Sequence, residues 1–167
     1  MSTVYEEIAQ KAVDWSKRFH DHRADCAVFA KAIARDYLAY LGAPAEAMQF
    51  VELDRELKAT EEHGPLHDVP RMTLGKDGYQ YFGLSVLYRT TKAAHRMTER
   101  TAVGLRKGAA QWQVMWNDTR YGIPFTDLSK LNVLFDAWTK TSRQMYEGPV
   151  TGNSTSIGFV PSVSDGR

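Results

Sequence analysis

The chain has 167 residues, of which 43% are hydrophobic and 25% are charged. This length can bury one substantial core and leaves no room for two ordinary domains. The single cysteine, Cys26, excludes an internal disulfide framework and a cysteine-rich zinc site. No apolar run approaches the roughly 20 residues of a membrane span, and the first residues lack the basic and apolar regions of a secretory signal. We therefore expect a soluble, cytoplasmic protein with no membrane partner.

Charge is distributed unevenly along the chain, although the formal net charge is only +1. Residues 1–70 carry 8 Lys or Arg against 13 Asp or Glu, whereas residues 71–107 carry 8 against 2. Such a basic segment can meet nucleic acid, an acidic protein, or the acidic part of another copy of the chain. The alternative interpretation is a solvated face that the acidic helices balance within the fold.

Two helices are predicted near the N-terminus. A Thr3-x-x-Glu6 capping box starts the first helix, which should end near His20. Its apolar residues recur at spacings of three and four, and they are Tyr5, Ile8, Ala12, Trp15 and Phe19. Asp25 is the expected N-cap of the second helix, which should stop at Gly42. The apolar face of this second helix consists of Cys26, Phe29, Ile33, Tyr37 and Leu41.

Strands are predicted in the middle of the chain. A short strand is expected at residues 48–53, and a hairpin should join residues 71–74 to residues 79–88 across a glycine-containing turn. A further strand or hairpin is marked by a turn at Asn117-Asp118. One face of this element holds Trp112, Val114 and Trp116.

Residues 91–103 are predicted to form a helix, because Lys92, Arg96 and Arg100 recur every four residues as a basic stripe. A last helix should begin near Thr126-Asp127 and bury Leu131, Leu134, Phe135, Trp138 and Met145. We assign residues 1–147 to a single domain of the α+β class. It should contain an antiparallel sheet of four or five strands, packed by the N-terminal helices and a C-terminal helix.

The last twenty residues differ in composition from the rest of the chain. Residues 148–167 are rich in Gly, Ser, Thr, Val and Pro and show neither helical nor strand periodicity. We expect a flexible C-terminal arm there. The alternative is an arm that becomes ordered on a neighbouring subunit or partner.

Cys26 is the most chemically suggestive residue, because it stands at the predicted start of a helix. The unpaired N–H groups and the dipole at that position favour the thiolate, which is the nucleophilic form. Catalysis would also need a base within hydrogen-bond reach of the sulfur and a third group that orients the base. A packed, inert cysteine is the alternative, since cysteine behaves as a small apolar residue and here shares a face with Phe29 and Ile33.

The segment around Cys26 resembles a known enzyme family. Asp-Cys-x-x-Phe-Ala at residues 25–30 is followed by a helix that ends in Leu-Gly-Ala-Pro-Ala-Glu at residues 41–46, and then by the apolar strand. Together these features look like the nucleophile segment of bacterial transglutaminase-like cysteine proteinases, in the papain-like superfamily. The resemblance covers residues 24–53.

This resemblance implies a thiol hydrolase or acyl transferase that acts on a peptide or protein, with Cys26 as the nucleophile. A histidine on the following strand would be the base, and either His67 or His63 is the candidate. An acid one strand later would orient it, and Asp77 or Asp68 is the candidate. This chain departs from the family pattern at the position of the acid, where it has Tyr81-Phe82-Gly83, and after the cysteine, where it has Ala27-Val28.

The sequence indicates no cofactor and no metal. His20 and His22 flank Asp21 and could approach a metal together with Asp25, but they do not make a full ligand set. His95 lies among basic residues and is expected at the surface. The chain contains neither common glycine-rich phosphate loop, which disfavours nucleotide-dependent enzymes.

The competing hypothesis is a non-enzymatic assembly or binding protein, of viral or phage structural type and located in the virion. It would use the basic segment 89–107 and the C-terminal tail to contact RNA or partner subunits, including further copies of itself. Tyr79 and Tyr81 would stack on exposed bases while basic side chains neutralise phosphates. Those basic side chains are Arg89, Lys92, Arg96, Arg100, Arg106 and Lys107.

Overall fold

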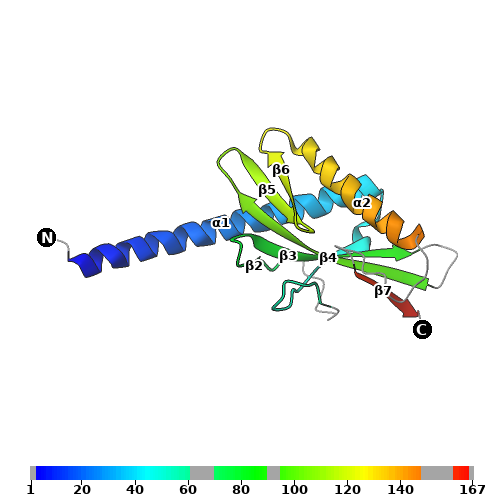
Figure 1. Cartoon of the computed structure of the whole chain (residues 1–167), viewed down its shortest axis with the longest axis horizontal. Helices are drawn as coiled ribbons and strands as arrows, with labels where there is room; N and C mark the ends of the chain where they lie inside the picture. Colours follow the sequence, from blue (N-terminus) through cyan, green and yellow to red (C-terminus); the bar gives the residue numbers. More distant parts are fainter. Residues whose placement is uncertain (1–2, 61–69, 90–94, 148–159, 166–167) are drawn as a thin grey trace.

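A computed structural model describes residues 3–60, 70–89, 95–147 and 160–165. The protein belongs to the α+β class, as predicted, and in these residues two α-helices pack against an antiparallel sheet (Figure 1). No helix in the described part of the chain is long and apolar enough to cross a membrane.

Helix α1 (Val4–Leu41) is continuous over 38 residues. Both predicted ends are confirmed: Thr3 and Glu6 form the capping box, and Gly42 closes the helix with a φ of 63°. The predicted break between His20 and Asp25 is wrong. No glycine or proline interrupts the helix. The carboxylate of Asp25, the expected N-cap, instead pairs with Lys107 Nζ at 2.8 Å.

In the described part of the chain the sheet has seven strands, five of which follow each other in the order β1-β3-β4-β5-β6. The prediction of four or five strands matches this path and omits the other two strands. The remaining two pair at the sides, β2 with β3 and β7 with β4. The strands are β1 (Met48–Val51), β2 (Thr73–Leu74), β3 (Gln80–Arg89), β4 (His95–Lys107), β5 (Gln111–Trp116), β6 (Thr119–Pro124) and β7 (Val160–Asp165).

The predicted hairpin is present, and the element that was expected as a strand or a hairpin is a hairpin. Strands β2 and β3 pair across the turn at residues 75–78, and β5 pairs with β6 from Gln111 to Trp116. Asn117 and Asp118 join β5 to β6 with φ values of 50° and 57°. Two consecutive positive φ values are typical of the tight turn whose twist matches that of a two-stranded ribbon.

The prediction of a helix over residues 91–103 is wrong, because residues 95–107 form the longest strand of the sheet. Ten residues of β4 pair with β3, from Leu105 opposite Gln80 to Arg96 opposite Arg89. A spacing of four residues lies on one face of a helix and equally on one face of a strand, so the basic stripe did not distinguish them. Lys92 lies outside the described residues.

Strand β7 pairs antiparallel with the N-terminal part of β4, from Asp165 opposite His95 to Val160 opposite Arg100. The expectation of an arm without strand structure is therefore wrong for residues 160–165. Strand β4 therefore pairs with β7 along its N-terminal part and with β5 along its C-terminal part. Residues 148–159 of the predicted arm lie outside the described residues.

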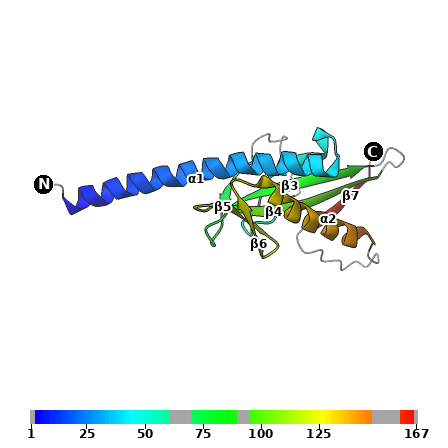
Figure 2. The same cartoon turned by 90° about the horizontal axis from the view of Figure 1, so that it is seen from above.

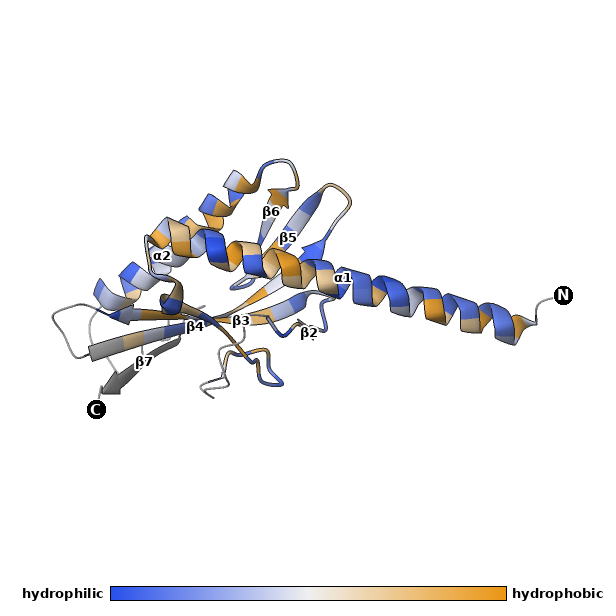
Figure 3. Ribbon diagram, turned by 180° about the vertical axis from the view of Figure 1, so that it is seen from behind, coloured by the Kyte–Doolittle hydropathy of each residue, from blue (hydrophilic) through white to orange (hydrophobic). Residues whose placement is uncertain are grey.

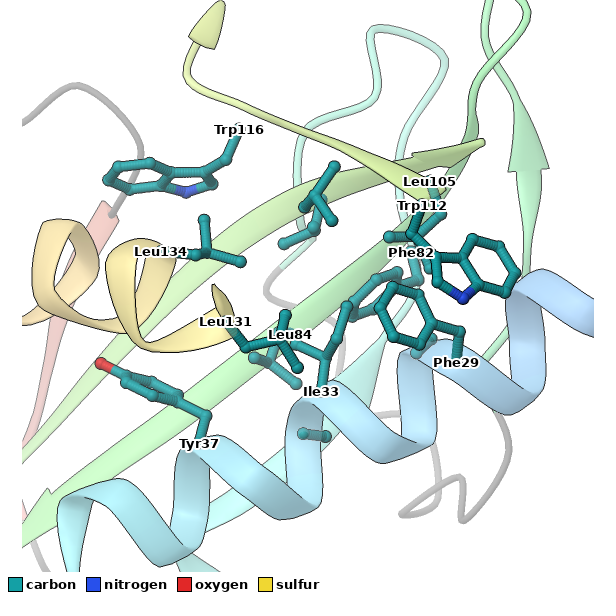
Figure 4. Close-up of a cluster of buried hydrophobic side chains, with 14 of the residues drawn as sticks. Phe29, Ile33, Tyr37, Phe82, Leu84, Leu105, Trp112, Trp116, Leu131 and Leu134 are labelled. Carbon is teal, nitrogen blue, oxygen red and sulfur yellow. The ribbon is translucent and has the colours of Figure 1, made fainter. Parts of the chain in front are cut away.

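The core lies between one face of the sheet and the two helices. The second half of α1 and helix α2 (Leu131–Glu147), which follows the short helix η2 (Leu128–Lys130), cover this face (Figures 1 and 2). Figure 4 shows side chains of both helices packed among those of β3, β4 and β5. The fully buried large side chains include Ile33, Tyr37, Phe82, Leu84, Leu105, Leu131, Leu134 and Trp138. Full burial of each such aliphatic side chain contributes about 1.5–3 kcal/mol.

The short helix η1 (Ala45–Ala47) connects α1 to β1 and places β1 beside β3. Phe50 of β1 contacts Phe82 of β3 with ring centroids 5.9 Å apart. Gly83 allows this pairing, because a Cβ at that position would lie 2.5 Å from the carbonyl oxygen of Val51.

Candidate functional site

Cys26 lies in the middle of α1 and is fully buried. Its sulfur lies 3.6 Å from Nε2 of His22, one helical turn earlier, and 3.8 Å from the carbonyl oxygen of Leu105 on β4. A mid-helix cysteine has no unpaired N–H groups around it, because those occur only in the first turn. The helix-dipole argument that singled out Cys26 therefore does not apply.

The surroundings of Cys26 favour the neutral thiol. Burial, and to a smaller extent the charge of Asp25, raise the pKa of the Cys26 thiol to about 12. Burial also lowers the pKa of His22, an effect that the nearby charges of Lys107 and Arg106 reinforce and that of Asp25 opposes. Near neutral pH the pair is thus a thiol beside a neutral imidazole, not the thiolate–imidazolium pair of an activated nucleophile.

The other members of the predicted catalytic set are not brought to Cys26 in the described residues. His63, His67 and Asp68 lie outside them. Asp77 lies in the β2–β3 turn, where its carboxylate accepts a hydrogen bond from the Tyr81 hydroxyl at 2.7 Å and one from the Tyr79 backbone N–H at 3.1 Å. These bonds give Asp77 a role in closing the turn. His22, which was considered only as a metal ligand, is the imidazole beside the sulfur.

The aromatic side chains of the predicted nucleic-acid surface are not an open stacking platform. Tyr79 is only 1% exposed, with the guanidinium of Arg106 4.6 Å from its ring centroid. Tyr81 is half-buried and lies over Gly104, where a Cβ would come within 2.8 Å of its ring. The expectation that both rings stack on exposed bases is wrong for Tyr79, because a base would need its buried face.

The basic side chains of that surface are mostly engaged within the protein. Arg106 donates two hydrogen bonds to Gln113 Oε1, and Lys107 pairs with Asp25. Arg89 pairs with Glu46 at 2.9 Å, and Arg100 is buried. Four of the six predicted phosphate-binding cations are therefore paired or buried, and the side chains of Lys92 and Arg96 lie outside the described residues.

Two grooves lie on opposite faces of the sheet. The first has a volume of about 650 Å³ and lies between α1 and β1, with Val28, Ala32, Leu38, Met48 and Phe50 among its lining residues. The second has a volume of about 440 Å³ and lies on the other face of the sheet, with Lys58, Tyr81, Arg100, Met115 and Asp118 among its lining residues. Cys26 lines neither groove.

The sequence did not lead us to expect a buried carboxyl on β4, because this segment was predicted to be helical. Glu99 is fully buried and accepts a hydrogen bond from Ser142 Oγ of α2 at 2.7 Å. Burial raises the pKa of Glu99, and hydrogen bonds from Ser142, Tyr146 and Tyr88 oppose this shift. Glu99 lines neither groove, so we assign its hydroxyl neighbours to partly satisfying a buried acid, whose Oε1 is left without a hydrogen bond among the described residues.

The most exposed apolar feature is the N-terminal half of α1, which projects beyond the sheet (Figures 1 and 2). We call residues 4–21 the α1 extension. Apart from Ser16 and Phe19, which are half-buried, every residue of the extension is exposed. Tyr5 is 81% exposed, Ile8 63% and Trp15 60%. Figure 3 shows apolar and polar residues alternating along this projecting helix.

Among the described residues, no group of three or more His, Cys, Asp or Glu side chains is placed to hold a metal ion. Comparison with known proteins found no matching family model, no matching curated protein and no matching solved structure. The resemblance of residues 24–53 to transglutaminase-like proteinases therefore stays a prediction.

Proposed function

We propose that this chain is a non-enzymatic assembly or binding protein that engages a partner protein through the α1 extension. The observation that carries the proposal is a long helix whose apolar stripe leaves the core and continues into solvent. At 1.5 Å per residue, the extension is about 27 Å long. Contiguous apolar patches that are exposed to solvent mark interaction sites.

The apolar stripe itself supports the proposal. Trp15 and Phe19 stack with ring centroids 5.4 Å apart, which forms a continuous aromatic surface on one side of the extension. Among the described residues, the first hydrogen bond from α1 to another element is that of Arg23 to the carbonyl oxygen of Met72, at 2.7 Å. The body of the protein therefore begins at about this residue and leaves the stripe before it uncovered.

The thiol hydrolase prediction has less support. A buried thiol with a raised pKa is a poor nucleophile, and neither groove places a substrate beside it. RNA binding through segment 89–107 is also less supported, because Tyr79 is buried and several of the cations are paired.

Photocrosslinking in the native host tests the proposal. We expect a benzoylphenylalanine introduced at Ile8 or Trp15 to give protein adducts, because both side chains lie on the apolar stripe. The same probe at Val13 or Lys17 is the control, since these residues are equally exposed but lie on other faces of the helix. Equal adduct yields on all faces, or no adducts at Ile8 and Trp15, would refute the proposal.

A further inference from the structure

The spacing of the apolar stripe is that of a helix-pairing surface. Tyr5, Ile8, Ala12, Trp15 and Phe19 are separated by three, four, three and four residues. This alternation continues without a break through His22, Cys26 and Phe29, of which the last two are in the core. Alternating spacings of three and four residues place every member on the seam that faces a second helix in a coiled coil. We call Tyr5 to Phe19 the seam.

The seam can be covered by one further helix because it is narrow. Residues next to a coiled-coil seam, at the positions on either side of it, approach the flanks of the partner helix. In the extension those flanking residues are Val4, Lys11 and Arg18 on one side and Ala9 and Ser16 on the other. No Asp or Glu occurs among them, so both charged flanking residues are cations.

The acidic residues of the extension lie elsewhere. Around the helix axis, each of them lies more than a quarter of a turn from the nearest seam residue; they are Glu6, Glu7, Asp14 and Asp21. Asp14 accepts a hydrogen bond from Gln10 at 3.0 Å, on the face away from the seam. Among the described residues, no ion pair includes Lys11 or Arg18.

This charge pattern discriminates between two occupants of the seam. A second copy in antiparallel orientation would bring Lys11 of one chain close to Arg18 of the other, and a parallel copy would place Lys11 opposite Ser16. Neither arrangement pairs Lys11 with an opposite charge, and the antiparallel one places like charges together, which opposes association. A helix with Asp or Glu on its flanks would instead pair with both cations.

Resting on the proposed function, we propose that the partner of the α1 extension is an amphipathic helix with an apolar seam flanked by Asp or Glu. The two helices pair as a short coiled coil over residues 4–21. Lys11 and Arg18 set which partner is accepted, while Ile8, Trp15 and Phe19 provide the apolar contact.

Two designed peptides of three heptads test this inference. Both carry Ile and Leu on the seam, and they differ only in having Glu or Lys at every flanking position. Binding to the full-length protein is measured by fluorescence anisotropy of the labelled peptides at low salt. We expect the Glu-flanked peptide to bind and the Lys-flanked peptide to bind at least about tenfold more weakly.

Four double variants test whether peptide binding depends on the seam and on its flanking residues. Ile8→Ala combined with Trp15→Ala should abolish binding, whereas Val13→Ala combined with Val28→Ala, at similarly exposed residues off the seam, should not. Lys11→Glu combined with Arg18→Glu should reverse the preference toward the Lys-flanked peptide. Lys17→Glu combined with Lys31→Glu changes the net charge equally and should leave the preference unchanged.

Equal binding of both peptides, or binding of neither, would overturn the inference. Self-association in sedimentation experiments that the Ile8→Ala, Trp15→Ala variant abolishes would also overturn it, because a second copy would then occupy the seam. These outcomes are distinct from failure of the proposed function. If crosslinks form at Ile8 and Trp15 in the host but neither peptide binds selectively, the inference of an acidic partner helix is wrong, whereas the proposal that the extension is an interaction surface is supported.

Discussion

The difference between the two halves of α1 predicts a large loss of stability for one aromatic-to-alanine substitution and almost none for another on the same helix. Phe29 is 5% exposed and stacks on Trp112 with ring centroids 4.3 Å apart. Truncation of a buried phenylalanine costs about 3–5 kcal/mol, and the lost aromatic stacking places Phe29→Ala above the lower end of that range. We expect a loss of about 4 kcal/mol in the free energy of unfolding.

Trp15→Ala should change the free energy of unfolding by no more than about 0.5 kcal/mol. Its ring is 60% exposed and contacts Phe19 four residues later, and such a pair contributes roughly 0.2–0.5 kcal/mol to a helix. Alanine has the higher helix propensity, which offsets part of this loss.

Urea unfolding followed by circular dichroism at 222 nm measures both variants with one probe. With a urea m-value of about 2 kcal/mol per molar, the midpoint should fall by about 2 M for Phe29→Ala and stay nearly constant for Trp15→Ala. A loss above about 1.5 kcal/mol for Trp15→Ala would refute the reasoning, because it would mean that the body or another copy covers the extension. Repeating the experiment at tenfold different protein concentrations separates these two causes.

Three further predictions concern Cys26, Glu99 and Asp118. With a pKa of about 12, Cys26 should resist iodoacetamide under native conditions near neutral pH and react after denaturation, as measured by mass spectrometry; fast native labelling would restore the nucleophile hypothesis. Burial raises the pKa of Glu99 in the folded state, so the stability associated with its protonated form is fully present below its unfolded pKa of about 4.5 and is lost as pH rises through the folded pKa. Glu99→Gln should therefore gain stability relative to the natural chain between acidic and neutral pH, and urea midpoints that stay parallel over this range would contradict the prediction. Asp118 has a φ of 57°, so Asp118→Gly should leave the melting temperature unchanged or raise it slightly, whereas Asp118→Val should cost about 1–2 kcal/mol; equal melting temperatures of the two variants would be inconsistent with this backbone conformation.

The features that could be predicted from the sequence are those with a local cause. The capping box at Thr3 and the left-handed cap at Gly42 depend on hydrogen bonds within a few residues, and both form as predicted. The turn at Asn117-Asp118 depends on two residues that tolerate positive φ. The apolar face of the last helix was predicted from its helical spacing, and its members from Leu131 to Trp138 are buried. Its predicted start near Thr126-Asp127 is wrong for the α-helix, which begins at Leu131, and Met145 is only half-buried.

The errors arose where one pattern fits two structures. The cations that suggested a helix over residues 91–103 have a spacing that a strand face shares, and pairing of β4 with β3 over ten residues decided the outcome. Asp25 is a good N-cap residue, but nothing between His20 and Asp25 prevents a helix from continuing. The assignment of Cys26 as a nucleophile depended on that break, so the continuity of α1 removed its main physical basis.

Short-range hydrogen bonding and backbone preferences thus determined, from the amino acids alone, the helix caps at Thr3 and Gly42, the tight turn at Asn117-Asp118, and that the chain mixes helices with antiparallel strands. The same spacing of three and four residues runs from Tyr5 to Phe29, and it does not indicate at which residue burial begins. Only the tertiary structure decided that Cys26 and Phe29 are covered while Tyr5 and Trp15 are exposed. The physical reason is that burial depends on which part of α1 the sheet reaches, and the sheet is assembled from strands distant in sequence.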